Sequence, residues 1–356
     1  MSEKLWQKNL IKIDPYVAGE QPKSAHIIKL NANENPYPPS PMVQQALDKF
    51  KGERLSKYPS MDAGPLREAI AEYYGLKKEN IFAGNGSDDV LATAFRAFFN
   101  SELPIVYPDI TYSFYPVWCE LLKIPCKTFA VDENFEINIS DYYAPNGGVV
   151  IPNPNAPTSI GLGREKIIDL LEHNRDCIVI IDEAYVDFGG YSAVELIEKY
   201  DNLVVTQTFS KSRSLAGMRV AAAISNPYLI KYMDAVKDSY NSYPMDSVAV
   251  EAGTASIKDK PYFEQTVKKI MATRQRTADE LKKLGFEMPE SSTNFLFCTH
   301  SKYKAQKIMD YLKSKNIYVR HFSKPRIDNY LRITIGTDEQ MEKLIAEIKN
   351  FISEQE

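Results

Sequence analysis

The chain has 356 residues, of which 44% are hydrophobic and 25% are charged, and its formal net charge is −4. This length allows a large hydrophobic core and favours two domains. The slightly acidic charge offers no basic surface, which argues against nucleic acid and anionic membranes as partners.

Neither a secretion signal nor a metal site is predicted. The N-terminus, MSEKLWQKNLIKIDPY, lacks the apolar core of a signal peptide, and runs such as CIVII are too short to span a bilayer. We therefore expect a cytoplasmic protein that does not enter a membrane. The four cysteines form no CxxC pair and the four histidines form no HExxH motif, so we expect no metal and no disulfide framework.

The first two thirds of the chain read as an arm followed by an α/β domain. The turn-rich stretch NANENPYPPSP separates residues 1–30 from the main body. Helical stretches such as LREAIAEYYG then alternate with buried strands, which are IFA, PIVYP, GGVVIPNP, CIVIIDEAY and NLVVTQTFS. This alternation predicts a mostly parallel sheet with helices on both faces.

After Pro244 the pattern changes to that of a compact α+β module. A charged amphipathic stretch covers roughly 246–284, and it is followed by the strand-like NFLFCT, IYVRHF and YLRITIG and by the helix DEQMEKLIAEIKNFI. We therefore predict an N-terminal arm at 1–30 that packs with the small domain, a large domain at 31–243, and a small C-terminal domain at 244–356.

Polar residues follow several of the predicted strands, where ligand groups gather in parallel sheets. GNGSDD opens a helix, and the N–H groups of Gly86, Ser87 and Asp88 could bind a phosphate there, although such a glycine turn is more often only a turn. IDEAY places Asp182 and Tyr185 at a strand end, where turn formers and packed aromatic residues are also common.

Lys211 lies in TFSKSRSLAGMR, directly after the strand NLVVTQ. Thr208, Ser210 and Arg219 surround it in sequence and form a group suited to an anion. A lysine in a serine-rich turn is usually a solvated surface residue, but this stretch is neither a helix face nor a run of charges. The turn NPNAPT follows another strand, and the bond before Pro157 is a candidate cis peptide.

Together these motifs resemble a known family. IDEAY, FSK with LAGMR, NANENP, KYP and LRITIGT resemble the fold-type-I aminotransferases, and their order is similar to that of the histidinol-phosphate aminotransferases. The match runs from about Tyr16 to Thr337. It implies the α/β fold of PLP-dependent transferases of type I, with a mostly parallel central sheet and a smaller α+β C-terminal domain. It also implies pyridoxal 5′-phosphate (PLP) as the cofactor.

The resemblance implies a role for each matching residue. Lys211 would hold PLP as a Schiff base and move the proton of the substrate Cα. Asp182 would pair with the ring nitrogen and Tyr185 with the phenolic oxygen. The other implied cofactor residues are Tyr112 on the ring face, Gly86, Ser87, Asp88, Thr208, Ser210 and Arg219 around the phosphate, and Tyr58, which reaches the phosphate of the neighbouring subunit.

Two arginines are implied in substrate binding. Arg332 would clamp the α-carboxylate of glutamate through a bidentate fork, and Arg320 would bind the phosphate of histidinol phosphate. The alternative for both is a surface charge on an edge strand. Tyr16 and Asn33 would contribute from the N-terminal segment, and Tyr243 is a further pocket candidate.

One turn departs from the family pattern. The family has Asn-Pro-Thr-Gly, whereas this chain has Ala156-Pro157-Thr158-Ser159. Alanine cannot make the bond that the family asparagine makes to the phenolic oxygen. We expect either that Asn155 takes its place or that Tyr185 carries the contact alone.

The implied reaction is the transamination of histidinol phosphate with 2-oxoglutarate, in a homodimer with shared active sites. In the biosynthetic direction it converts imidazole-acetol phosphate and glutamate into histidinol phosphate and 2-oxoglutarate, a step of histidine biosynthesis. An O-phosphothreonine decarboxylase and a broad-specificity aromatic aminotransferase remain alternatives. A PLP-binding regulator would need a DNA-binding module, for which residues 1–30 leave no room. A nucleotide-binding domain would need GxGxxG or GxxxxGK[ST], and neither motif is present.

Overall fold

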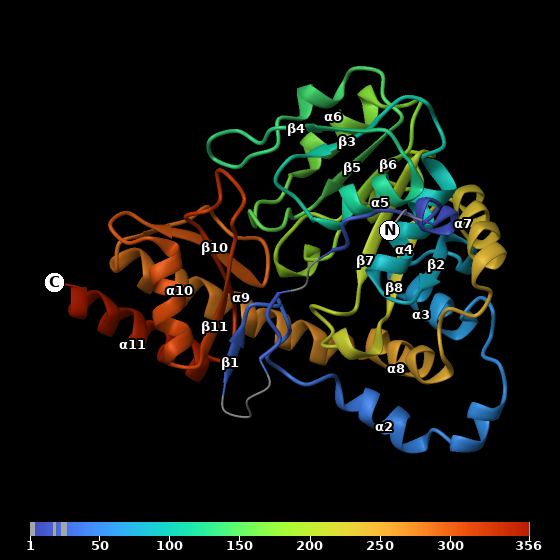
Figure 1. The fold of residues 1–356 in the computed structure, drawn as a ribbon. Coiled ribbons are helices and arrows are strands. Elements are labelled where there is room, and N and C mark those ends of the chain that lie inside the picture. The colour runs from blue at the N-terminus through green and yellow to red at the C-terminus, as the bar shows by residue number, and fades with distance from the viewer. Residues whose placement is uncertain (1–3, 17–18, 23–26, 356) are drawn as a thin grey trace.

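A seven-stranded sheet organises the larger part of the chain in this computed structural model, which describes residues 4–16, 19–22 and 27–355 (Figure 1). The strand order is β2-β8-β7-β6-β5-β3-β4. The strands are β2 (Ile81–Gly84), β3 (Ile105–Pro108), β4 (Cys126–Phe129), β5 (Gly148–Pro152), β6 (Val179–Asp182), β7 (Leu203–Thr208) and β8 (Ala221–Ser225). Only β8 runs antiparallel to its neighbours, so the predicted mostly parallel sheet is confirmed.

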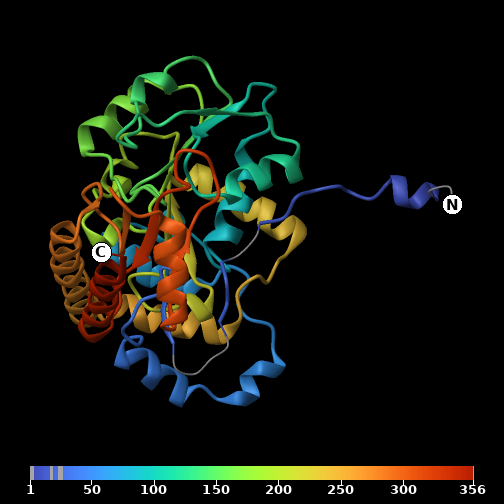
Figure 2. The ribbon, with the colours of Figure 1, turned by 60° about the vertical axis from the view of Figure 1, so that its left-hand side comes forward.

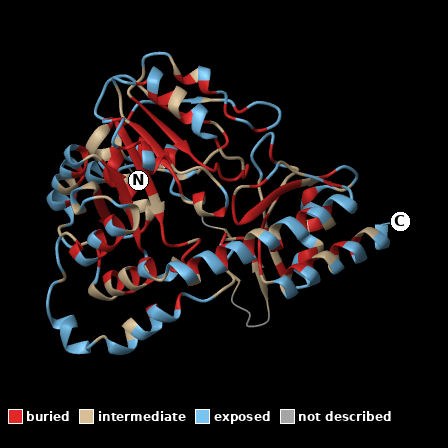
Figure 3. Ribbon diagram, turned by 180° about the vertical axis from the view of Figure 1, so that it is seen from behind, coloured by how far each residue is buried: buried red, intermediate tan, exposed pale blue. Residues whose placement is uncertain are grey.

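Helices cover both faces of this sheet, which explains why its strands are apolar on both sides. In β5, Val149 and Ile151 face one core cluster and Val150 faces the other. One face is covered by α4 (Ser87–Phe98), α5 (Phe114–Leu122) and α7 (Pro227–Tyr240), and the other by α3 (Gly64–Tyr74), α6 (Arg164–His173) and α8 (Ser247–Lys258). Figure 3 shows the strands buried between these helices, whose outer faces are exposed.

The second sheet has five strands in the order β1-β11-β12-β10-β9. β1 comes from the N-terminal segment and pairs in parallel with β11, whereas the other pairs are antiparallel. The elements are β1 (Ile28–Leu30), β9 (Phe286–Glu287), β10 (Phe295–His300), β11 (Ile317–His321) and β12 (Leu331–Thr334), with α9 (Lys260–Lys283), α10 (Ala305–Ser314) and α11 (Asp338–Gln355). The exact residues at which domains divide stay a prediction.

The remaining elements lie at the periphery. α1 (Leu5–Lys8) belongs to a segment that extends away from the rest of the chain (Figure 2). α2 (Pro41–Lys49) packs on α8. The short 3₁₀ helices are η1 (Gly52–Ser56), η2 (Lys78–Asn80), η3 (Ile139–Tyr142), η4 (Val186–Phe188), η5 (Ala193–Leu196) and η6 (Ala216–Met218). Among the described residues, no helix combines the length and the apolar character needed to cross a membrane.

The amphipathic stretch expected at 246–284 is two helices, because α8 ends at Lys258 and α9 begins at Lys260. Pro261 lies in the first turn of α9, where a backbone N–H would have no partner inside the helix. If α8 continued through this position, the proline ring would clash with the carbonyl of the preceding helical turn. Asp259 caps the new helix by accepting a hydrogen bond from the Tyr262 amide at 3.3 Å.

Candidate active site

Adjacent strand ends bring three predicted catalytic residues to one edge of the large sheet. Asp182 is the last residue of β6, Tyr185 follows it, and Lys211 follows β7, the next strand in the sheet. The Lys211 amine lies 5.8 Å from the centroid of the Tyr185 ring. The same amine donates a hydrogen bond to the carbonyl of Ala32 at 3.4 Å. The parallel topology therefore places the amine, the phenol and the carboxylate near one another.

The Asp182 carboxylate is buried and hydrogen bonded. Tyr115 donates its hydroxyl hydrogen to Oδ2 at 2.8 Å, and Thr206 donates to Oδ1 at 3.2 Å. Burial raises the pKa of Asp182 to about 6, whereas the bonds from Tyr115 and Thr206 act in the opposite direction. A carboxylate held in this way is suited to pair with a cationic N–H donor.

The turn expected to bind an anion lies at the start of α4. Ser87 and Asp88 occupy the first turn, whose N–H groups have no acceptor inside a helix. The N–H of Gly86, in contrast, donates to the Gly84 carbonyl at 2.9 Å, so it is not free as we had expected. The Asp88 side chain accepts a bond from the Arg219 guanidinium at 3.3 Å, which brings that arginine to the turn.

Gly86 is required at this turn for two reasons. Its φ is +86°, a conformation that side chains disfavour. A Cβ atom at this position would also lie 2.5 Å from an Arg219 guanidinium nitrogen. The glycine therefore leaves the space in which Arg219 lies against the start of α4.

We expect Gly86→Ala to lower the free energy of unfolding by about 1–3 kcal/mol and to weaken PLP binding, because the backbone is strained and Arg219 is displaced. Urea denaturation of the apoprotein and a PLP titration measure the two effects. Gly217→Ala is the matched control, since no atom lies within 4 Å of the added Cβ there. Equal behaviour of the two variants would contradict the prediction.

Thr208 is the last residue of β7 and Ser210 directly precedes Lys211, and both are buried. The Thr208 hydroxyl donates to the Ser210 hydroxyl at 3.0 Å and accepts from the Ser210 amide at 3.2 Å. This local turn fixes the chain immediately before the lysine. Tyr112 contacts the first turn of α4, because its hydroxyl donates to the Asp88 carboxylate at 2.8 Å.

Tyr16 joins the same aromatic group as Tyr112. It stacks on Phe114 with a centroid distance of 4.4 Å, and it lies 6.5 Å from Tyr112. The N-terminal segment therefore reaches the aromatic residues that follow β3, and the role of Tyr16 in substrate binding stays a prediction.

Arg320 and Arg332 face each other across neighbouring strands. β11 and β12 are interior strands of the small sheet, so neither arginine is an edge-strand charge. Burial lowers the pKa of Arg332, and the charge of Arg320 acts in the same direction. Arg332 donates to the carbonyl of Asn31 at 3.1 Å, but its buried Nε has no partner. No ion pair among the described residues includes either arginine, so both guanidinium groups are available to an anionic ligand.

The NANEN segment connects the arginine strand with the lysine turn. Thr334, at the end of β12, donates to the Asn33 side-chain oxygen at 3.1 Å, and the Asn33 amide donates to the Tyr185 hydroxyl at 2.9 Å. Two residues on, the Asn35 amide donates to the Lys211 carbonyl at 2.9 Å. Asn33 thus orients Tyr185 in this arrangement, while Asn35 holds the backbone of Lys211.

Asn155 is one of the two residues expected to contact the phenolic oxygen. Its amide group donates to the Ile110 carbonyl at 2.9 Å and to the Thr158 hydroxyl at 3.0 Å, which uses both amide hydrogens. Its Oδ1 is buried without a partner. Asn155 therefore has no free amide hydrogen for a phenolic oxygen in this arrangement, which favours Tyr185, the other residue expected to make that contact. The peptide bond before Pro157 is cis, as we had considered.

Known proteins resemble the chain in sequence and in fold. The chain matches the family described as aminotransferase class I and II over residues 25–348. The chain belongs to this family. It is 49% identical over 351 residues to a histidinol-phosphate aminotransferase of Lactococcus lactis subsp. cremoris (strain SK11), with 99% of each chain covered. It is 50% identical over 352 residues to a histidinol-phosphate aminotransferase of Acinetobacter baumannii (strain SDF), with 98% of each chain covered.

The solved structure of the histidinol-phosphate aminotransferase of Sinorhizobium meliloti, in complex with pyridoxal 5′-phosphate, has the same fold. The TM-score is 0.83 at 24% sequence identity, and 91% of each chain is covered. The predicted fold class and the predicted aminotransferase activity are thereby confirmed.

In this aminotransferase, Tyr58 and Tyr243 stack on each other with a centroid distance of 4.8 Å. Tyr58 is 83% exposed and Tyr243 is 39% exposed. The structure thus pairs Tyr243 with the residue expected to serve a neighbouring subunit. Tyrosine is one of the residues enriched at protein–protein interfaces.

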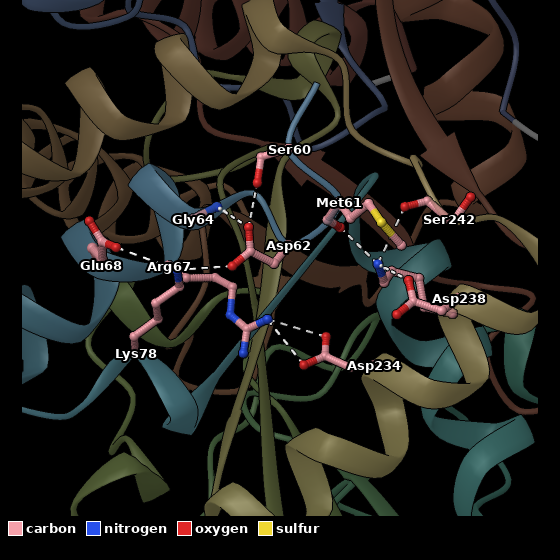
Figure 4. A network of polar contacts seen from close by, with 11 residues as sticks. Ser60, Met61, Asp62, Gly64, Arg67, Glu68, Lys78, Asp234, Asp238 and Ser242 are labelled. Carbon is pink, nitrogen blue, oxygen red and sulfur yellow. Dashed lines mark hydrogen bonds and ion pairs between the residues drawn. The ribbon is translucent and has the colours of Figure 1, made fainter. Parts of the chain in front are cut away.

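A buried lysine holds the two loops that carry this pair, and Figure 4 labels its partners Met61, Asp238 and Ser242. Lys237, on α7, donates to the carbonyl of Met61 at 2.7 Å and to the carbonyl of Ser242 at 3.5 Å. Its amine also lies 2.6 Å from the carboxylate of Asp238. Met61 is three residues from Tyr58 in the sequence, and Ser242 precedes Tyr243. One amine therefore ties both loops to α7.

We expect Lys237→Met in this aminotransferase to lower the free energy of unfolding by about 1–3 kcal/mol, because two carbonyl groups lose their donor. Urea denaturation measures the change. Lys231→Met on the same helix is the control, since Lys231 is exposed. A Lys237→Met variant as stable as the control would refute this role.

Three residues in contact with the site were not predicted from the sequence: Tyr115, Thr206 and Asn35. Thr206 alternates with Thr208, and period-2 spacing places both on one face of β7. Tyr115 follows Tyr112 by three residues, close to one helical turn. Asn35 is the third asparagine of NANEN. These spacings are the only signals that the sequence offers for them.

Proposed function

We propose that this aminotransferase transfers an amino group between histidinol phosphate and 2-oxoglutarate, with imidazole-acetol phosphate and glutamate as the other pair, in histidine biosynthesis. The observation that carries the proposal is the pair of guanidinium groups of Arg320 and Arg332, which lie on neighbouring strands and have no carboxylate partner among the residues that the structure describes. Both proposed substrates are anions. Relatives named histidinol-phosphate aminotransferase, at 49% and 50% identity, support the same substrate.

The chemistry of the strand-end residues fits PLP. Lys211 offers the amine, Asp182 a buried carboxylate, and Tyr185 a phenol. The N-terminus of α4 and Arg219 suit a phosphate dianion, and the space at Gly86 is one that a Cβ atom would fill. When bound, PLP supplies an electron sink for the negative charge that develops at the substrate Cα.

The side chains of this chain would divide the remaining work. Lys211 would move the proton between the substrate Cα and the C4′ atom of the cofactor. Asp182 keeps the ring nitrogen protonated, and Tyr185 donates to the phenolic oxygen. Arg332 orients the α-carboxylate of glutamate by a bidentate fork, and Arg320 binds the phosphate of histidinol phosphate.

We further propose a cytoplasmic homodimer in which Tyr58, stacked on Tyr243, reaches the phosphate at the neighbouring active site. The support is the exposure of the Tyr58 side chain. Among the described contacts, Tyr243 is the aromatic residue of the same chain on which the Tyr58 ring stacks. Mixed dimers of Lys211→Ala and Tyr58→Ala chains test the shared site. Such a dimer contains one site with neither defect, so activity is expected to return on mixing, and its absence would overturn the shared site.

Parallel assays of the purified protein test the substrate. We expect glutamate to form from 2-oxoglutarate with a higher kcat/KM for histidinol phosphate than for phenylalanine. A preference for phenylalanine would support the aromatic aminotransferase instead. Release of carbon dioxide from O-phosphothreonine would overturn transamination as the main activity.

A further inference from the structure

The hydroxyl group of Tyr115 contacts the site carboxylate but has no part in the proposed reaction. It donates to Oδ2 of Asp182 at 2.8 Å, and both residues are buried. We infer that Tyr115 is a positioning residue, whose hydroxyl holds the Asp182 carboxylate ionised and in the orientation that pairs with the ring nitrogen of the cofactor. This inference rests on the proposed function.

Packing fixes the position of the Tyr115 hydroxyl. The side chain is fully buried, and its ring lies edge-on to Tyr107 at 5.7 Å and 6.1 Å from both Phe95 and Trp118. A ring enclosed on several sides cannot change rotamer without disturbing this aromatic core. The packed ring therefore holds the Tyr115 hydroxyl in one position, so the hydroxyl can fix the orientation of the Asp182 carboxylate.

The hydrogen-bonding capacity of Asp182 leaves room for one more donor. An ionised carboxylate offers about four acceptor positions. Tyr115 uses one on Oδ2, Thr206 uses one on Oδ1, and the backbone N–H of Ala184 supplies a third bond. All three partners donate, so they favour the ionised form over the neutral acid. The remaining position suits the N–H of a protonated ring.

The charges around Asp182 make these donors necessary. Burial disfavours the ionised carboxylate, and the negative charge of Asp88 acts in the same direction. Tyr112 and Tyr185 are the other titratable groups that face this pair, and neither brings a positive charge at neutral pH. Among the groups that oppose burial, the Tyr115 hydroxyl is the largest contributor.

Tyr115 also contacts the residue predicted to lie on the cofactor ring. Its ring packs edge-on against Tyr112 with a centroid distance of 5.7 Å and an interplanar angle of 85°. One side chain of α5 therefore contacts both the partner of the ring nitrogen and the aromatic face.

The Tyr115→Phe variant tests the inference, because it keeps the ring and removes the hydroxyl. We expect the apoprotein to bind PLP about 10- to 100-fold more weakly, since a hydrogen bond to a buried charge is lost. We also expect the pH midpoint of the near-visible absorbance to rise by about half a unit or more. A ring nitrogen that loses its proton no longer repels the proton on the Lys211 nitrogen.

Tyr107→Phe is the matched control. Tyr107 is buried in the same aromatic group, but its hydroxyl donates to the Cys126 thiol at 3.4 Å and not to Asp182. The control is expected to keep the wild-type PLP affinity and absorbance midpoint. A merely structural role of Tyr115 would leave the midpoint unchanged.

Thr206→Val removes the other hydroxyl at the same carboxylate and is expected to shift the midpoint in the same direction by less. It keeps the test available if Tyr115→Phe does not fold. A wild-type midpoint and affinity in Tyr115→Phe, or the same shift in Tyr107→Phe, would overturn the inference. If the wild-type protein itself binds no PLP, the proposed function fails, and this outcome is distinct from the failure of the inference.

Discussion

Replacement of Lys211 by alanine is expected to abolish transamination and to remove the near-visible absorbance of the purified protein. The amine is both the proposed attachment point of PLP and the group that moves the Cα proton. Loss of acid–base catalysis alone costs about 10²–10⁴-fold in rate, and loss of the attachment point adds to it. Absorbance spectra and glutamate formation from histidinol phosphate and 2-oxoglutarate measure the two effects.

Two further variants make this experiment specific. Lys211→Arg keeps the positive charge but cannot form the covalent link, so it is expected to be as inactive as the alanine variant. Lys199→Ala removes an exposed lysine and is expected to behave like the wild type. A Lys211→Ala protein with the wild-type spectrum would mean that another group holds the cofactor.

Removal of either arginine is expected to lower kcat/KM mainly for one of the two substrates. Arg332→Ala should lower kcat/KM for 2-oxoglutarate by about 10²–10³-fold, because a bidentate charge-assisted contact is lost. Arg320→Ala should lower kcat/KM for histidinol phosphate by a similar factor and affect 2-oxoglutarate less. Steady-state kinetics with one substrate varied at a time measure each value.

An exposed arginine supplies the control for this pair. Arg164 is half exposed and paired with Glu195, so Arg164→Ala is expected to leave both kinetic constants unchanged. Equal losses for both substrates in Arg320→Ala and Arg332→Ala would refute the division of roles, and so would a loss confined to the other substrate in each case.

The sequence predicted the parts of the site that follow apolar strands. Asp182 and Lys211 each come directly after a buried run, and adjacent parallel strands end at the same edge, so their proximity follows from the pattern. The helices α3 and α4 were also predictable, because amphipathic periodicity marks the first and a glycine turn marks the start of the second. Arg320 and Arg332 lie in strands of the expected module.

Other features depend on packing that no local pattern encodes. β8 was missed because its sequence AAAIS favours a helix by propensity, although the sheet buries it. β4 was missed because its residues CKTF are largely exposed at a sheet edge. The engagement of the Asn155 amide depends on the Ile110 carbonyl, 45 residues away. Tyr115 looks like any other aromatic core residue until its hydroxyl is placed.

The parallel pairing of β1 with β11 has a consequence for synthesis of the chain. Ile28 pairs with Ile317, so the first strand leaves the ribosome long before its partner exists. At about 5–20 residues per second, the delay is on the order of tens of seconds, during which the large sheet can form first. A strand without its partner has unpaired backbone groups that can bind the strands of other chains. Because β1 has only 3 residues, it offers few free backbone groups while it waits.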